Sequence, residues 1–114
     1  MAASLEDLAV ADGDPIATEH IELAVAGREF DYGRGTSQIF ETGGATTYVE
    51  GGQSSHGEWY VDGEGRFCSF WPPTYRACYG LNWIVEDGHV VGVRFTERDR
   101  GSQFAGRYKE KTGS

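Results

Sequence analysis

Apolar and polar residues alternate along most of the chain after Gly27, with the period of two that is typical of β-strands. Glycine-rich turns interrupt this alternation at short intervals. Asp87-Gly88 gives the strongest hairpin signal, because both residue types tolerate the positive φ angles of a type I′ turn. The pattern predicts eight strands, at residues 28–33, 36–41, 45–50, 56–61, 66–71, 76–85, 89–96 and 103–108.

Hairpins that follow one another so closely predict an antiparallel meander. An open meander would leave its first and last strands unpaired, whereas a closed sheet pairs every strand. We therefore expect a mostly β protein, an antiparallel up-and-down barrel of about eight strands with a short N-terminal helix. A β-sandwich is the alternative architecture.

The segment before the first strand carries helix signals at both ends. Asp14-Pro15 is typical of a helix start, and Gly27 suits the position just after a helix end. The apolar residues between them have helical spacing: Ala17, Ile21, Ala24 and Val25. A strand is the alternative, because Ile21, Leu23 and Val25 also alternate, but the end signals favour the helix.

Length and composition agree with one small domain. The chain has 114 residues, of which 39% are apolar, and this is enough for a single core. We expect a flexible N-terminal segment at residues 1–14, the barrel domain at residues 15–108, and a flexible C-terminal tail at residues 109–114.

Charge excludes some classes of partner. Ten basic residues against 18 acidic ones give a net charge of −8, which opposes binding to nucleic acid or to an anionic membrane surface. The chain contains no apolar run long enough to cross a membrane as a helix. Its first residues do not resemble a signal peptide, so we expect a cytoplasmic location, or a periplasmic one if a leader has been removed.

The turns assign strand registers and therefore two faces. A loop at residues 62–65 would set Trp59 opposite Cys68, and the Asp87-Gly88 turn would set Ile84 opposite Val91. We expect the more aliphatic face inside the barrel: Trp59, Val61, Cys68, Phe70, Cys78, Ile84, Val91, Val93 and Phe95, with Arg66, Arg76 and Asn82 among them. The other face would cover the helix, a ligand or a second copy of the chain in a homodimer: Glu58, Tyr60, Phe67, Ser69, Tyr79, Leu81, Trp83 and Arg94.

A turn centred on Pro72-Pro73 would set Cys68 directly opposite Cys78. Such a pair can form a disulfide or remain two small buried thiols. A cytoplasmic location favours the thiols, and export would favour the disulfide.

One stretch of the chain resembles a known group. Gly57-Glu58-Trp59-Tyr60-Val61, Phe67-Cys68-Ser69-Phe70-Trp71 and Cys78-Tyr79 form a G-x-W-x-V … C-x-x-W … C pattern. This pattern resembles small proteobacterial lipocalin-like (calycin-type) barrel domains of unknown function. The similarity spans about residues 15–85, and it implies a barrel without assigning a catalytic residue.

The sequence contains no strong catalytic or metal-binding motif. The glycines occupy turns between strands rather than a phosphate-binding loop, and the three histidines lack metal-ligand spacing, so we expect no metal and no cofactor. His56, Glu58 and Tyr60 share a strand face and could supply acid–base groups at a barrel mouth. Tyr79 and Arg94 complete the set of catalytic candidates.

Three functions are open at this point. The first is binding of a small apolar or aromatic ligand, including a carboxylate, by an apolar wall of Trp59, Phe70 and Phe95 with Arg76 and Asn82 as polar anchors. The second is a cofactor-independent lyase, isomerase or cyclase that uses the acid–base candidates. The third is a protein-interaction or homo-oligomeric module that uses the aromatic face with Tyr60, Phe67, Tyr79 and Trp83.

Overall fold

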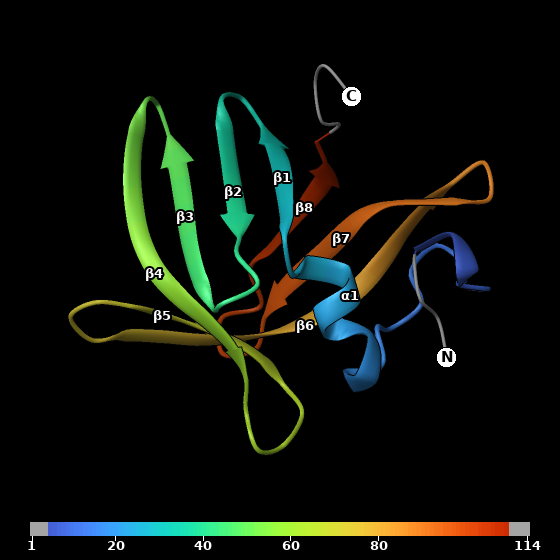
Figure 1. Cartoon of the computed structure of the whole chain (residues 1–114), viewed down its shortest axis with the longest axis horizontal. Coiled ribbons are helices and arrows are strands. Elements are labelled where there is room, and N and C mark those ends of the chain that lie inside the picture. Colours follow the sequence, from blue (N-terminus) through green and yellow to red (C-terminus); the bar gives the residue numbers. More distant parts are fainter. Residues whose placement is uncertain (1–4, 110–114) are drawn as a thin grey trace.

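A computed structural model describes residues 5–109, which form one closed antiparallel barrel. Each strand pairs with the next along the chain, and β8 returns to pair with β1 (Figure 1). The strands are β1 (Arg28–Gly33), β2 (Thr36–Phe40), β3 (Ala45–Glu50), β4 (Gln53–Val61), β5 (Phe67–Trp71), β6 (Tyr75–Glu86), β7 (His89–Glu97) and β8 (Gln103–Tyr108). The up-and-down barrel predicted from the hydrophobic pattern is confirmed.

The segment before β1 contains a short helix, but this helix does not begin at the predicted cap. A 3-10 turn, η2 (Thr18–His20), leads directly into α1 (Ile21–Val25) without a side-chain hydrogen bond at either N-terminus. The expectation for Pro15 is wrong, because this residue forms an isolated β-bridge with Asn82 on β6. Gly27 follows the helix with a φ of +71°, as its position just after the helix end requires.

The helix closes one end of the barrel. Ile21, Ala24 and Val25 turn inward and join the core. The hydroxyl of Tyr108 donates to the carbonyl oxygen of Ala24 at 2.7 Å, and Thr18 donates to the carbonyl oxygen of Gly65 at 3.1 Å. These contacts fix α1 at the end where β1 begins (Figure 1). The opposite end is left to the four hairpin turns that follow β1, β3, β5 and β7.

Residues 5–14, which belong to the segment expected to be flexible, contact the barrel in the structure. Residues 5–7 form a 3-10 turn, η1 (Leu5–Asp7), and Leu5 and Leu8 pack against the core. Farther along, the amide of Gly13 donates to the carbonyl oxygen of Trp83, and the amide of Trp83 donates to that of Asp14, each at 2.9 Å. The expected tail at residues 109–114 lies outside the described residues, apart from Lys109.

The register between β4 and β5 differs by one residue from the prediction. Val61 pairs with Phe67 rather than with Arg66, and Trp59 pairs with Ser69 rather than with Cys68. The reason is the intervening loop, in which Arg66 belongs to the turn and its side chain pairs with Asp62 at 2.7 Å. The shift turns Phe67 and Ser69 into the barrel and turns Cys68 to the other face of β5, where it is still buried.

A second shift of one residue occurs between β6 and β7. The Asp87-Gly88 turn is confirmed by the pairing of Glu86 with His89. However, an irregularity between Ile84 and Val85 then sets Ile84 opposite Gly92 rather than Val91.

The two shifts explain why the core combines residues from both predicted faces. Three of its residues come from the face expected outside: Phe67, Leu81 and Trp83. Three others come from the face expected inside: Trp59, Val93 and Phe95. Over the described part of the chain, no helix has both the length and the apolar character needed to cross a membrane.

Candidate functional site

The open end of the barrel contains a cavity of about 690 Å³. Its wall comes from the ends of β1, β3 and β5 and the beginnings of β2, β4, β6 and β8, so nearly every strand contributes. Most of its side chains are aromatic or hydroxyl-bearing. The lining residues are Tyr32, Thr36, Gln38, Tyr48, Ser55, His56, Trp71, Pro72, Tyr75, Tyr79 and Phe104.

A smaller space of about 30 Å³ lies deeper in the barrel. It shares five residues with the upper cavity: Tyr32, Gln38, Trp71, Tyr79 and Phe104. Its floor is a cluster of three rings, with Phe67 lying 5.6 Å from Phe40 and 6.0 Å from Phe95 between ring centroids. Because these rings are almost completely buried, the cavity ends at the apolar core.

A chain of hydrogen bonds fixes one wall of the cavity. The Tyr32 hydroxyl donates to Oε1 of Gln38 at 2.7 Å, and Nε2 of Gln38 donates to Oγ1 of Thr46 at 2.8 Å. The Thr46 hydroxyl in turn donates to the carbonyl oxygen of Ile39 at 2.7 Å. The network orients the Gln38 amide, because its oxygen faces a donor and its nitrogen faces an acceptor.

A second set of hydrogen bonds lies on the opposite wall, where Trp71, Ser69 and Tyr79 come together. Nε1 of Trp71 donates to Oγ of Ser69 at 3.1 Å. Burial raises the pKa of Tyr79, and a hydrogen bond from Ser69 opposes this rise.

The tyrosines of the cavity keep their protons at neutral pH. Burial is the main reason that the pKa of Tyr32 lies far above its ordinary value, and burial likewise raises the pKa of Tyr48. A hydrogen bond to Glu97 raises the pKa of Tyr75 to about 12. These side chains offer neutral hydroxyl groups rather than phenolate charges.

Glycines on neighbouring strands make room for two of the rings. A Cβ atom at Gly57 would lie 2.6 Å from the ring of Trp71, and a Cβ atom at Gly106 would lie 2.7 Å from the ring of Tyr32. Real Cβ atoms do not approach so closely, so only glycine allows the rings to lie flat over these positions. The shape of the cavity therefore depends on Gly57 and Gly106.

The charged groups close to the cavity have both signs, since the Arg100 guanidinium lies 5.6 Å from the centre of the Tyr75 ring. Glu50 accepts from the Tyr48 hydroxyl at 3.0 Å, and Glu97 accepts from the Tyr75 hydroxyl. No lysine or arginine is among the residues that line the cavity in the described part of the chain. His56 is the basic side chain of the lining, and its Nδ1 lies 3.2 Å from the hydroxyl of Thr47.

The predicted ligand-binding residues do not meet in this cavity. Trp59 and Phe95 are inside the barrel but belong to the packed core, where Nε1 of Trp59 donates to the carbonyl oxygen of Glu41 at 2.8 Å. Phe70, Arg76 and Asn82 lie on the outer surface, contrary to expectation. The register shift between β4 and β5 places Phe70 and Arg76 there as a pair.

These outer residues are held by contacts of their own. The Arg76 guanidinium lies 4.4 Å above the Phe70 ring and donates to the Tyr60 hydroxyl at 3.0 Å. Asn82 donates to the carbonyl oxygen of Gly13 at 2.9 Å. Arg66 was also expected inside, but it pairs with Asp62 in the loop after β4.

The predicted catalytic residues are divided between two sides of the wall. His56 and Tyr79 line the cavity. Glu58 and Tyr60 instead border a shallow outer groove with Arg76, and Arg94 lies exposed on β7 opposite Asn82. Tyr79 points into the barrel from β6, whereas Glu58 and Tyr60 share the outer face of β4, so this set does not form one acid–base site.

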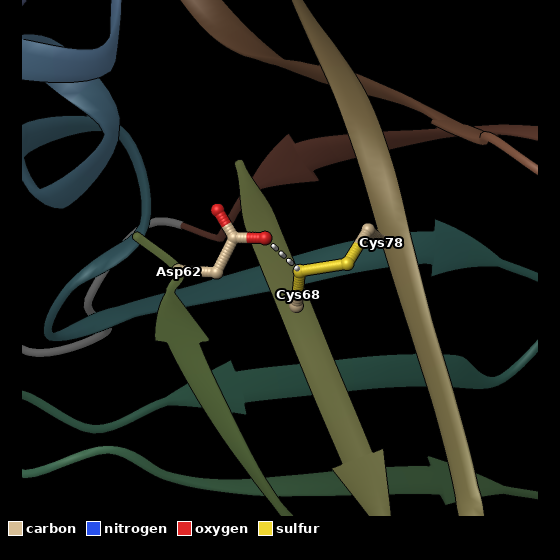
Figure 2. Close-up of side chains that lie close together, drawn as sticks. All are labelled: Asp62, Cys68 and Cys78. Atoms are coloured by element: carbon tan, nitrogen blue, oxygen red, sulfur yellow. Dashed lines mark hydrogen bonds between the residues drawn. A yellow bond between two sulfur atoms is a disulfide. The ribbon is translucent and has the colours of Figure 1, made fainter. Parts of the chain in front are cut away.

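Cys68 and Cys78 form a disulfide between β5 and β6, at a Cα–Cα distance of 3.9 Å (Figure 2). Of the two alternatives that the sequence left open, the structure has the disulfide, and the predicted register that sets these residues opposite each other is confirmed. The carboxylate of Asp62 points toward this bond, with Oδ2 3.9 Å from Sγ of Cys68.

The three side chains Asp62, Cys68 and Cys78 have the spacing of metal ligands. Thiolates bind metals well, but the sulfurs here are bonded to each other. Asp62 is also engaged, because its carboxylate accepts from the backbone amides of Glu64 and Arg66 at 2.9 Å each. These hydrogen bonds and the Arg66 side chain lower the pKa of Asp62. We therefore interpret the three side chains as a structural cluster that joins the loop after β4 to β5 and β6.

Sequence reasoning missed most of the cavity residues. The signal was present as polar-tipped residues spaced by two at strand ends that meet at one barrel end, such as Thr36 and Gln38, and Ser69 and Trp71. Counting which turns lie at the same end of a meander would have grouped them. Comparison of the chain with protein-family models, with curated proteins and with solved structures found no match.

Proposed function

We propose that this protein binds a small, largely apolar or aromatic molecule in the cavity at the open end of the barrel. The observation that carries the proposal is the cavity of about 690 Å³, closed below by the phenylalanine floor. This volume falls within the range of roughly 300–1,000 Å³ that small-molecule sites occupy. Its wall combines aromatic rings with hydroxyl, amide and imidazole groups, and small-molecule sites likewise join an apolar surface with polar groups that orient the ligand.

The ring arrangement supports a preformed site. Phe104 lies 5.2 Å from Tyr32 and 5.9 Å from Tyr79 between centroids, with both pairs edge to face. Trp71 lies 6.4 Å from Tyr48 in the same kind of contact. Rings that support one another in this way leave little freedom to lose on binding, so a flat ligand can enter at low cost.

The alternative function as a protein-interaction module is supported less well, because most of its aromatic face is not on the surface. Phe67, Tyr79 and Trp83 from that face lie inside the barrel, and only Tyr60 lies outside. The catalytic alternative is supported less well for a similar reason, because Glu58, Tyr60 and Arg94 lie away from the cavity. The resemblance to lipocalin-like domains stays a prediction.

The experiment compares two tryptophan substitutions on β2. Thr36 lines the cavity, whereas its neighbour Ser37 points to the outside of the same strand. Each variant and the wild type are titrated with N-phenyl-1-naphthylamine, a neutral aromatic probe whose fluorescence rises in apolar surroundings. We expect saturable binding by the wild type and by Ser37→Trp, and at least tenfold weaker binding by Thr36→Trp.

Two outcomes would overturn the proposal. One is the absence of saturable binding by the wild type. The other is equal affinity of the two tryptophan variants, which would place the probe elsewhere on the molecule. Circular dichroism of each variant checks that the barrel has folded.

A further inference from the structure

The deeper part of the cavity presents hydrogen-bond donors. Nε2 of Gln38 has two hydrogens, and one of them is used on Thr46. Within the described residues, the other hydrogen has no acceptor. Tyr79 also lines this deeper part, where its hydroxyl lies beside Ser69, and a phenol O–H can donate to a ligand.

These two donors border the same small space. Gln38 is on β2 and Tyr79 is on β6, and both line the lower cavity of about 30 Å³ as well as the upper one. Roughly 10–15 Å³ is the least volume that holds a water molecule, so this space is suited to one or two small atoms. A ring system does not fit there, but one oxygen atom attached to a ring does.

The upper cavity has room for the ring that carries this oxygen. It is wide and aromatic, with Tyr32, Trp71 and Phe104 continuing from the lower space to the upper one. A flat ligand that stands among these rings would point one substituent down toward Gln38 and Tyr79. The donors then require that substituent to be a hydrogen-bond acceptor.

The surroundings disfavour a charged acceptor. A carboxylate loses its hydration on entering an apolar cavity and needs a cation or several donors in return. The described lining offers no lysine or arginine, and at the rim the single guanidinium of Arg100, stacked on Tyr75, is accompanied by the carboxylates of Glu50 and Glu97. The net charge of −8 adds a repulsion of the same sign. The carboxylate ligand considered from the sequence needed Arg76, which lies on the outside.

We propose that the site selects uncharged planar molecules that carry a carbonyl oxygen, such as an aryl ketone, aldehyde or lactone, and that Gln38 and Tyr79 hydrogen-bond this oxygen in the lower cavity. This inference rests on the proposed binding function. It assigns Gln38 and Tyr79 as the specificity-determining residues, and it leaves the rings above them to supply the apolar contact.

The experiment uses three naphthalenes of nearly equal size. They are 2-acetylnaphthalene, which is a neutral ketone; 2-ethylnaphthalene, which is a hydrocarbon; and 2-naphthoate, which is an anion. Affinities are measured at neutral pH by tryptophan fluorescence quenching and isothermal titration calorimetry. One neutral hydrogen bond contributes about 1 kcal/mol net, so two should favour the ketone over the hydrocarbon by roughly tenfold or more. We expect naphthoate to bind more weakly than either.

Tyr79→Phe tests the assignment with minimal change of shape. We expect this variant to lose about fivefold of the affinity for the ketone, because one of the two hydrogen bonds is removed, while its affinity for the hydrocarbon stays unchanged. Tyr60→Phe is the matched control, because Tyr60 lies on the outer surface with Arg76. The carbonyl stretching frequency of the bound ketone gives a second readout, since a hydrogen-bonded carbonyl absorbs at lower frequency and Tyr79→Phe should raise it.

The outcomes separate the two proposals. If none of the three naphthalenes binds, the binding function itself fails. If the ketone and the hydrocarbon bind equally, if naphthoate binds most tightly, or if Tyr79→Phe and Tyr60→Phe behave alike, the cavity remains a binding site but the donor assignment is wrong.

Discussion

Removal of the disulfide between β5 and β6 should lower the stability of the barrel by a calculable amount. The bond joins Cys68 to Cys78, which are 10 residues apart. In the chain-entropy model, cross-linking a loop of this length restricts the unfolded chain enough to stabilise the folded state by about 3 kcal/mol. For a domain of this size, such a loss should lower the melting temperature by roughly 12 °C.

The assay compares three samples by urea unfolding followed through tryptophan fluorescence. These are the oxidised wild type, the wild type reduced with a phosphine, and the double variant Cys68→Ala/Cys78→Ala. Comparison of the oxidised and reduced wild type isolates the cross-link, because the side chains are otherwise the same. Comparison with the double variant adds the loss of packing at Cys68, which is completely buried.

Two results would contradict this reasoning. If reduction changes the free energy of unfolding by less than about 0.5 kcal/mol, the hairpin already restrains the unfolded chain and the model overstates the effect. If the oxidised wild type contains free thiols, the bond does not form in solution. Adding the reductant to the double variant should change nothing, and this serves as the control.

Three further predictions follow from contacts described above. Gly106→Ala should destabilise the barrel by roughly 2 kcal/mol or more, because the new Cβ would lie 2.9 Å from the ring of Phe30 and 2.7 Å from that of Tyr32. Gly80→Ala is the control, because its Cβ enters open space and should shift the urea midpoint little. At alkaline pH the free energy of unfolding should fall progressively above about pH 10, because the pKa values of Tyr32, Tyr75 and Tyr108 are raised and the unfolded chain then releases protons that the folded chain keeps. Tyr75→Phe should make the fall between about pH 10 and the Tyr75 pKa of about 12 less steep, as urea midpoints across that range would show, because only the contribution of Tyr75 is removed. At acid pH the free energy of unfolding should fall as Asp62 is protonated, because its hydrogen bonds with Arg66 lower the pKa of this carboxyl below its ordinary value. Asp62→Asn should be less stable than the wild type at pH 7 and should lose less further stability on acidification. Equal acid sensitivity of the two proteins would refute this role of Asp62.

The fold could be predicted because alternation and turn residues are local properties. β1, β3 and β8 have the predicted limits, and the turn at Asp87-Gly88 has the predicted pairing. The pairing of Cys68 with Cys78 also follows from local spacing around one turn. Each of these depends on a few neighbouring residues, and the closure of the sheet follows from their number.

The faces of the strands could not be predicted so well, because each face depends on a register with an error of one residue. The predicted loop after β4 ended at Gly65, but Asp62 binds the amide and the guanidinium of Arg66 and draws that residue into the turn. The irregularity at Ile84 and Val85 has no marker of its own in the sequence. As a result, Phe70 and Arg76 lie on the outer face and Tyr79 on the inner face, opposite to the prediction. The predicted candidate site was therefore wrong in these residues.

Residues 13–16, which precede α1, form backbone hydrogen bonds with β6, and these bonds affect whether β6 can pair with a strand of another molecule. β5 ends its pairing with β6 at Tyr79, so the second half of β6 has no strand from the meander on that side. Residues 13–16 occupy the place, with Ile16 donating to the carbonyl oxygen of Leu81 and Asp14 accepting from the amide of Trp83, each at 2.9 Å. Without this segment, those backbone groups would form a template on which a strand of another molecule could add. Residues 13–16 therefore cover backbone groups of β6 that would otherwise be open to pairing with a strand of another molecule.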